Sequence, residues 1–295
     1  MILPGATYLV TRRCAQRQFL LRPSALINQI VTYCLAFAAE QVGIVIYGWV
    51  FMSNHWHAVV HDPDGRLPEF MACINKLIGK CVNASLGRWE SLWSSGSYSA
   101  VRLESEDDIV EKLVYVLANP VDACLVEAHS QWPGAISKPR SCVNQPKVVR
   151  RPSIFFRNDG LMPETVTLEA KKPECFEEET AHQFAARLAA KVKAREGELL
   201  AQHAEAKRTV LGPKAVLAQD PFDSPQSLEP RRNLNPRVAS KDKWKRIEAL
   251  GRLKAFLDAY REAWQAFKAG VRDVVFPAGT YWMVKHAGMA GAPPE

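Results

Sequence analysis

The sequence lacks the cysteine patterns of a disulfide-stapled or zinc-thiolate fold. Its seven cysteines are scattered, without a CxxC pair, and their number is odd. A disulfide framework or a thiolate zinc site is therefore disfavoured, and a reducing compartment, the cytoplasm, fits best. The opening residues, MILPGATYLVTRRC, also lack the basic segment and long apolar stretch of a signal peptide.

Long hydrophobic runs are missing as well. In the most apolar region, residues 26–52, Glu40 and Gln41 interrupt the pattern. The runs that remain are about ten residues long, too short to span a bilayer, so we expect no membrane association. Neither GxxxxGK[ST] nor HExxH occurs. Their absence argues against an ATP-binding P-loop and against a zinc hydrolase.

The composition is that of a globular protein with a basic surface. The chain has 295 residues, 47% of them hydrophobic, which is enough for a packed core and roughly two domains. Its net charge is +7 and its pI is about 9.0. A positive charge favours polyanionic partners, nucleic acid first.

Hydrophobic periodicity predicts an α+β sandwich followed by a mostly helical extension. We expect the order β-α-β-β-α-β-α up to about residue 144, with an antiparallel sheet and the helices on one face. Residues 145–178 show little periodicity and are interpreted as a linker. The predicted strands are 6–14, 42–52, 55–61 and 97–105, and the predicted helices are 24–41, 67–86, 105–121, 178–208 and 243–270.

Two histidines one residue apart lie inside an apolar strand, in the stretch GWVFMSNHWHAVVH. Residues i and i+2 of a strand face the same way, so His55 and His57 project together. Two adjacent imidazoles make half of a metal site; the alternative is a pair of partly buried, hydrogen-bonded histidines. His61 has the same parity but stands beside a turn, where we expect it to face solvent.

The predicted helix 105–121 carries a second polar pair. Tyr115 and Asn119 are four residues apart in LVYVLANPV and share one helix face. The alternative is a core tyrosine and an ordinary helix end, with Pro120 terminating the helix.

Together, FMSNHWHAVV and YVLANPVDACLV resemble the single-tyrosine HUH transposases, specifically the branch of REP-associated tyrosine transposases, over about residues 5–140. The resemblance implies a ferredoxin-like sandwich, the HUH domain, over residues 1–144. A linker and charged helical extension would follow at 145–240. An amphipathic helix and tail at 241–295 would form a possible accessory DNA-binding region.

The resemblance also implies roles for individual residues. His55 and His57 would bind Mg²⁺ or Mn²⁺, with Asn119 where relatives place a third, amide-bearing ligand, often Gln. Tyr115 would attack single-stranded DNA, commonly beside a hairpin, and give a 5′-phosphotyrosine and a free 3′-OH. One departure is that Asp122 and Cys124 replace the basic residue and glycine expected after Asn-Pro-Val. A second is that the long C-terminal half has no counterpart in the minimal enzymes.

Cationic and aromatic side chains are candidates for DNA contacts, with ordinary solvated charges or core packing as the alternative. Basic stretches at 229–237 and 241–246 are candidates for a second DNA contact. The cationic candidates are Arg12, Arg13, Lys76, Lys80, Arg88 and Arg102, and the aromatic ones are Trp89, Trp93 and Tyr98.

Three functions remain open from the sequence. The first is a transposase-like single-strand DNA transesterase that needs a divalent metal. The second is a domesticated hairpin-binding protein without turnover, and the third is a replication or relaxase-type nickase. The sequence is compatible with a monomer or a homodimer.

Overall fold

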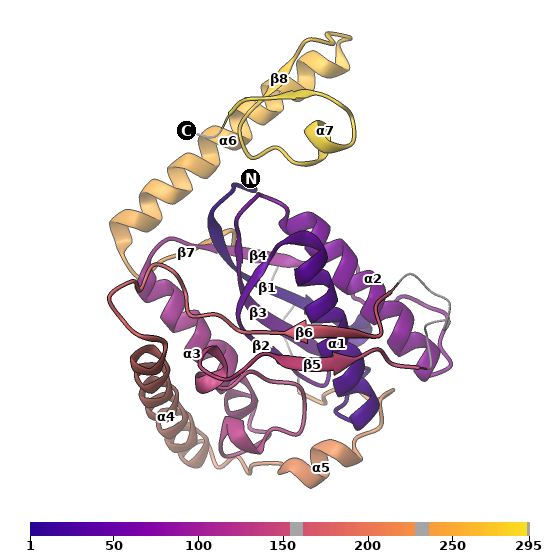
Figure 1. The fold of residues 1–295 in the computed structure, drawn as a ribbon, viewed down its shortest axis with the longest axis vertical. Helices are drawn as coiled ribbons and strands as arrows, with labels where there is room; N and C mark the ends of the chain where they lie inside the picture. The colour runs from indigo at the N-terminus through magenta and orange to yellow at the C-terminus, as the bar shows by residue number, and fades with distance from the viewer. Residues whose placement is uncertain (154–161, 228–235, 294–295) are drawn as a thin grey trace.

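The computed structural model describes residues 1–153, 162–227 and 236–293. Its first part follows the predicted order of strands and helices (Figure 1). This part consists of β1 (Ala6–Arg13), α1 (Ala25–Val42), β2 (Val45–Phe51), β3 (His55–Asp62), α2 (Leu67–Ser85), β4 (Ser99–Leu103) and α3 (Glu106–Asp122). Single 3-10 turns are η1 (Ala15–Arg17), η2 (His129–Gln131) and η3 (Pro139–Cys142).

The rest of the chain is built mainly of helices, with short strands between them. Its elements are β5 (Lys147–Arg150), β6 (Thr165–Leu168), α4 (Ala181–Glu205), α5 (Pro213–Ala218), β7 (Val238–Ala239), α6 (Lys243–Lys268), β8 (Val275–Phe276), α7 (Trp282–Lys285) and β9 (Ala290–Gly291). No helix in the described ranges is both long and apolar enough to cross a membrane.

The central sheet is five-stranded and mostly antiparallel, which confirms the predicted α+β class. Its strand order is β2-β3-β1-β4-β7. The pairs among β1, β2, β3 and β4 are antiparallel, whereas β7 joins β4 in parallel from the C-terminal part of the chain. Antiparallel pairing sets β1 directly against β3, so that Thr11 faces His57 and Arg13 faces His55 across the ladder.

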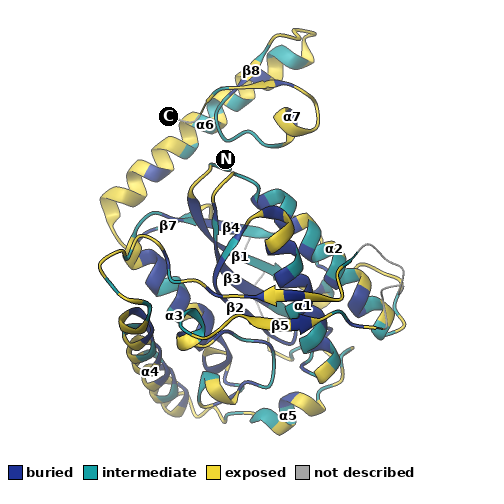
Figure 2. Ribbon diagram, viewed as in Figure 1, coloured by how far each residue is buried: buried dark blue, intermediate teal, exposed yellow. Residues whose placement is uncertain are grey.

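Helices cover both faces of the sheet, and the expectation that they cover one face is wrong. On one face, Tyr8, Phe51 and Trp56 share a core with α1 and α2. On the other face, Leu9 and Val59 share a core with α3 and α4. The physical reason is visible in β2 and β3, where nearly every residue is buried, so apolar side chains of both parities need cover (Figure 2).

Helix α3 is held close to the sheet. Ser105 caps it by accepting a hydrogen bond from the Asp108 backbone N–H. Pro120 lies inside the last turn rather than ending the helix, which continues to Asp122. At Gly48 on β2 a Cβ would come within 2.8 Å of Leu113 Cδ2, so glycine permits the close approach of α3.

The segment interpreted as a linker contains an ordered hairpin. Strands β5 and β6 pair antiparallel, and Val149, Val166 and Leu168 join the core beneath α1. Helix α4 packs along α3 through Phe184, Leu188 and other apolar residues. The two strands are held in place because Val149 of β5 and the alternate residues Val166 and Leu168 of β6 are apolar and share a core with α1. The division into three domains stays a prediction.

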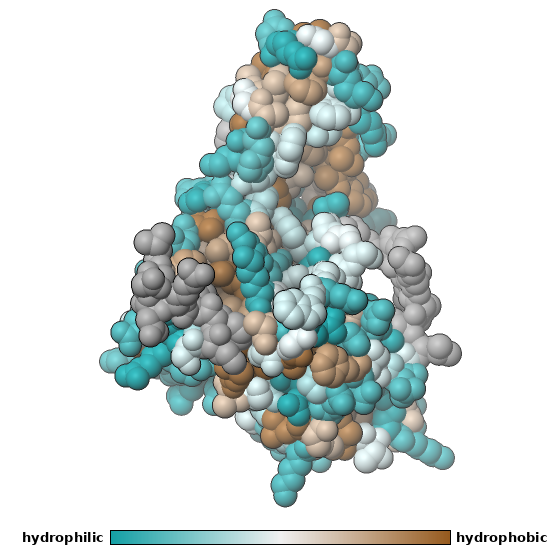
Figure 3. Space-filling model, turned by 90° about the vertical axis from the view of Figure 1, so that its right-hand side faces the viewer, coloured by the Kyte–Doolittle hydropathy of each residue, from teal (hydrophilic) through white to brown (hydrophobic). Residues whose placement is uncertain are grey.

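Helix α6 is the most exposed of the long helices. It extends away from the sheet toward the C-terminal loops (Figures 1 and 2), and only Ala249 and Ala263 are buried. Figure 3 shows apolar residues interspersed with polar ones on one face of this upper part. Arg252 anchors α6 to the sheet end by an ion pair with Glu104, which also pairs with Arg102.

Candidate active site

The predicted histidines and tyrosine meet on one face of the sheet. His55 and His57 project from β3 on the same side as Val59, the side covered by α3. Their ring centroids are 4.8 Å apart and nearly perpendicular. Tyr115, on the sheet-facing side of α3, places its ring centroid 5.2 Å from that of His57.

His57 is the buried centre of this cluster. Its Nδ1 lies 2.6 Å from the Thr11 hydroxyl, and its Nε2 lies 3.4 Å from the hydroxyl of Tyr115. Burial, with smaller contributions from the nearby His55 and Arg13, holds the pKa of His57 well below its usual value. His57 is therefore neutral at pH 7, and one of its ring nitrogens carries a lone pair.

The tautomer of His55 follows from its neighbour Asn54. The Asn54 amide nitrogen donates to the Arg17 carbonyl, so its oxygen Oδ1 is the atom that lies 2.7 Å from His55 Nδ1. An amide oxygen only accepts, and Nδ1 must therefore carry the proton when His55 is neutral. In that state the basic nitrogen of His55 is Nε2, the arrangement commonly found in metal-binding histidines.

Tyr115 combines access to solvent with a shielded hydroxyl. Its side chain is 38% exposed. Burial of the hydroxyl and the negative charge of Asp122 raise the pKa of Tyr115, while a hydrogen bond from Asn119 and the positive charge of Arg13 lower it. Asp122 was noted in the sequence only as a departure from a pattern, and here it acts on the phenol directly.

His55, His57 and Asn119 carry nitrogen and oxygen atoms of the kinds that bind divalent cations. His55 and His57 present adjacent imidazoles, and the buried Asn119 amide donates through nitrogen to Tyr115, which leaves its oxygen as a potential ligand. Within the described ranges no three His, Cys, Asp or Glu side chains are grouped to hold a metal ion. Any site here would thus rely on two imidazoles and an amide.

His61 lies apart from this cluster, nearer the other end of β3. It is half-buried, with its Nδ1 3.2 Å from the Thr7 hydroxyl and its ring stacked at 6.1 Å on Tyr47. His61 was expected to face solvent, and its half-buried position agrees with that expectation only in part.

The predicted DNA-contacting residues are not gathered in one place. Arg13 is exposed and lies beside the site, opposite His55 in the ladder. Arg12 points to the other face and donates to the carbonyls of Ser94 and Gly96. Lys76 and Lys80 are exposed on α2, across the sheet from Tyr115.

The remaining candidates have local partners. Arg88 donates to Gln18, and Arg102 pairs with Glu104. Trp93 is buried and donates to the Asn75 carbonyl, whereas Trp89 is 97% exposed. Of the two basic stretches, residues 229–235 lie outside the described residues, and residues 241–246 lead into α6.

A cavity of about 770 Å³ adjoins His55. Arg13, Asn54 and His55 line one side, and Arg208 and residues 219–227 of the C-terminal part line the other. A second cavity, of about 690 Å³, borders Tyr115 between α3 and α4. Sequence patterns did not indicate these walls, because the two sides of the first cavity are nearly 200 residues apart in the chain.

The fold and site thus define an α+β protein with a tyrosine hydroxyl beside paired histidines. No protein-family model and no curated protein matches the chain. Among solved structures, the chain is similar to a REP-associated tyrosine transposase bound to a REP hairpin, with 18% identity and a TM-score of 0.40, covering 56% of this chain and 93% of that one. Because this likeness is distant, the functional argument depends on the site geometry.

Proposed function

We propose that the chain is a transposase-like, metal-dependent single-strand DNA transesterase in which Tyr115 is the nucleophile. The observation that supports this best is the distance of 3.4 Å between Tyr115 Oη and His57 Nε2, beside the second imidazole of His55. A phenol this close to two imidazoles can reach a phosphate group that those rings help to position.

In the cleavage step, Tyr115 Oη forms a bond to the scissile phosphorus, and the bond from phosphorus to the 3′-oxygen breaks. The phenol gives up its proton to base, and the departing 3′-oxygen takes one up. The products are a 5′-phosphotyrosine and a free 3′-OH. A phenol, with a pKa of about 10, leaves more readily than an alkyl alcohol, so a 3′-OH can later attack the link and rejoin the strand.

His55, His57 and Asn119 would hold the cation, Mg²⁺ or Mn²⁺. When bound, such an ion polarises the phosphate and offsets negative charge on its oxygens. Thr11 and Asn54 orient the two rings through their Nδ1 atoms. The low pKa of His57 keeps it unprotonated and able to act as a ligand at neutral pH.

Single-stranded DNA, next to a hairpin, is the proposed partner. The cavity beside His55 carries Arg13, Arg17 and Arg208, which suit a phosphate backbone. One cavity borders Tyr115 and the other borders His55, so a strand could enter the site through one and leave through the other.

The decisive experiment is a test for a covalent protein–DNA adduct. Full-length protein is incubated with labelled single-stranded DNA carrying a hairpin and Mn²⁺, and the products are separated under denaturing conditions. We expect an adduct with the wild type and with Tyr281→Phe, a matched control far from the site, and no adduct with Tyr115→Phe, which should still bind the DNA.

Other outcomes assign other functions. An adduct that persists in Tyr115→Phe would transfer the role of nucleophile to another residue. DNA binding without any adduct in the wild type would favour the hairpin-binding alternative. An adduct that never transfers to a free 3′-OH strand would favour a nickase.

A further inference from the structure

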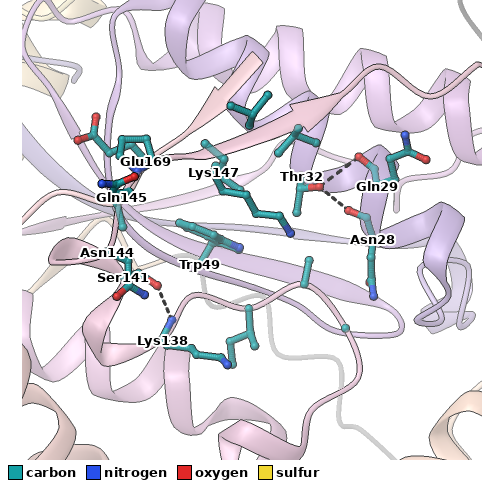
Figure 4. Close-up of a pocket in the computed structure, with 18 of the residues that line it drawn as sticks. Asn28, Gln29, Thr32, Trp49, Lys138, Ser141, Asn144, Gln145, Lys147 and Glu169 are labelled. Atoms are coloured by element: carbon teal, nitrogen blue, oxygen red, sulfur yellow. Dashed lines mark hydrogen bonds between the residues drawn. The ribbon is translucent and has the colours of Figure 1, made fainter. Parts of the chain in front are cut away.

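A separate cavity of about 610 Å³ lies at the edge strand β2, on the face of the sheet covered by α1. Its walls come from α1, from residues 134–150 and from the β5–β6 hairpin (Figure 4). It shares no lining residue with the cavities beside Tyr115 and His55. The cavity is thus independent of the proposed cleavage site.

Trp49 forms the floor of this cavity and presents a polar atom without a partner. Its side chain is 6% exposed, and among the described residues no acceptor lies within hydrogen-bonding distance of the buried indole Nε1. Two hydrogen bonds to Ser137 hold the backbone of Trp49. The Trp49 N–H donates to Ser137 Oγ, and the Trp49 carbonyl accepts from the Ser137 N–H. In Figure 4 the indole nitrogen of Trp49 lies on the side of the ring nearer the end of the Lys147 side chain. A buried donor of this kind favours a ligand that brings an acceptor.

The charges around Trp49 are mainly positive. Lys138, Lys147 and Arg150 line the cavity together with one carboxylate, that of Glu169. In Figure 4 the Lys147 side chain reaches over the cavity toward the indole nitrogen. An ammonium group and an indole N–H that converge on one space are both donors, so together they suit an oxyanion.

The opposite wall of the cavity carries amide side chains, which offer hydrogen-bond acceptors. The amide nitrogens of Asn28 and Gln29 donate to the carbonyls of Pro133 and Arg150. Each side-chain oxygen therefore remains as an acceptor for N–H groups of a ligand. The apolar Ala135, Val149 and Leu168 complete the lining and suit a flat ring.

We infer that this cavity binds a nucleotide, with its phosphate at Lys147 and Trp49 Nε1 and its base against the amide and apolar wall. A cavity of about 610 Å³ is larger than inorganic phosphate needs and accommodates a mononucleotide. The nucleotide is either free or part of a single strand, because both present the same chemistry.

The test is isothermal titration calorimetry on the full chain with dTMP, dGMP, inorganic phosphate and a 5′-phosphorylated thymidine tetranucleotide. We expect Lys147→Met and Trp49→Phe each to weaken nucleotide binding about tenfold. Lys193→Met, which removes an exposed charge on α4, is the matched control and should bind like the wild type. Tyr115→Phe should also bind like the wild type, so failure of the cleavage proposal would leave this result unchanged.

The arms of the experiment separate the two sources of the ligand. If Lys147→Met weakens the binding of the mononucleotides but not of the tetranucleotide, the ligand is a free nucleotide. If Lys147→Met also weakens the binding of the tetranucleotide, the ligand is a nucleotide within a strand. Absence of binding at millimolar concentration, equal affinity for inorganic phosphate, or binding indifferent to Lys147→Met would overturn the inference. Lys147 is exposed, so its variant is expected to fold, and thermal unfolding checks Trp49→Phe.

Discussion

The hydroxyl of Tyr115 lies 3.4 Å from Nε2 of His57, although 58 positions separate the two residues. The contact joins helix α3 to strand β3, and it brings the proposed nucleophile to the two imidazoles. The reactivity proposed for Tyr115 depends on the ionisation of its phenol, on the amide of Asn119 and on the position of α3 against the sheet.

The charge of Asp122 gives a prediction about pH. Burial and Asp122 raise the pKa of Tyr115, so the phenolate fraction is small at pH 7 and grows about tenfold per pH unit while the pH stays below that pKa. We expect the rate of adduct formation with Mg²⁺ to rise steadily from pH 7 to 9. Asp122→Asn lowers the pKa of Tyr115 and should accelerate the reaction at pH 8, by less than about tenfold because Asp122 is exposed.

Rate measurements at several pH values check this, with Glu205→Gln as a control. That substitution removes the same charge at the exposed end of α4, where it should leave the rate unchanged. A rate independent of pH over this range would contradict the role of phenol ionisation.

The order of strands and helices could be predicted because it depends on local patterns. Alternation in β3 and the four-residue spacing of Tyr115 and Asn119 each fix a direction of projection within one element. From these two facts the sequence predicts two half-sites. Their meeting depends on the packing of α3 against β2 and β3, and the family resemblance, not periodicity, was the reason to expect it.

Features that depend on distant pairing could not be predicted. Thr11 reaches His57 only because β1 pairs with β3 in one register. The opposite projection of Arg12 and Arg13, by contrast, follows from local alternation within β1 and could have been predicted. Strand β7 is two residues long, too short for any periodic pattern. The second helical layer went unrecognised because a strand buried on both faces has no polar alternation to mark either face.

Asn119 is predicted to have two separable functions. Its amide nitrogen lowers the pKa of Tyr115 by hydrogen bonding, and its oxygen is the proposed metal ligand. Asn119→Asp keeps an oxygen but loses the donor and adds a negative charge, so we expect Mn²⁺ binding to persist and adduct formation to slow at least tenfold. Asn119→Ala should lose both properties.

Mn²⁺ affinity by electron paramagnetic resonance and adduct rates distinguish the two variants. If Asn119→Ala binds Mn²⁺ as tightly as the wild type, the amide is not a metal ligand. The effect of Asn119 would then be limited to lowering the pKa of the Tyr115 phenol.

The position of α3 is predicted to depend on Gly48. A Cβ there would lie 2.8 Å from Leu113 Cδ2 and 3.2 Å from Ser137 Oγ, so Gly48→Ala must displace α3 or the strand. We expect a loss of about 1–3 kcal/mol in the free energy of unfolding and a slower adduct reaction, because Tyr115 is two residues from Leu113. Urea denaturation measures the first effect.

Gly197→Ala is the matched control on α4, where a Cβ would meet no atom within 4 Å. It should stabilise the protein by about 0.5–1 kcal/mol through helix propensity and leave the reaction unchanged. Wild-type stability and activity in Gly48→Ala would show that the contact relaxes at no cost.

The two sides of the sheet are predicted to contribute unequally to DNA binding. Arg13 stands beside the cavity at His55, whereas Lys76 and Lys80 project from α2 on the other face. We expect Arg13→Gln to weaken binding of single-stranded DNA and to reduce the slope of log K against log salt by about 0.7, the value for one phosphate contact on a single strand. The double variant Lys76→Gln/Lys80→Gln removes more charge from the protein and should leave the slope unchanged. Fluorescence anisotropy at 50–300 mM salt, with the Tyr115→Phe background to prevent cleavage, measures both. A larger loss in the lysine pair than in Arg13→Gln would place the DNA path on the α2 face and separate it from Tyr115.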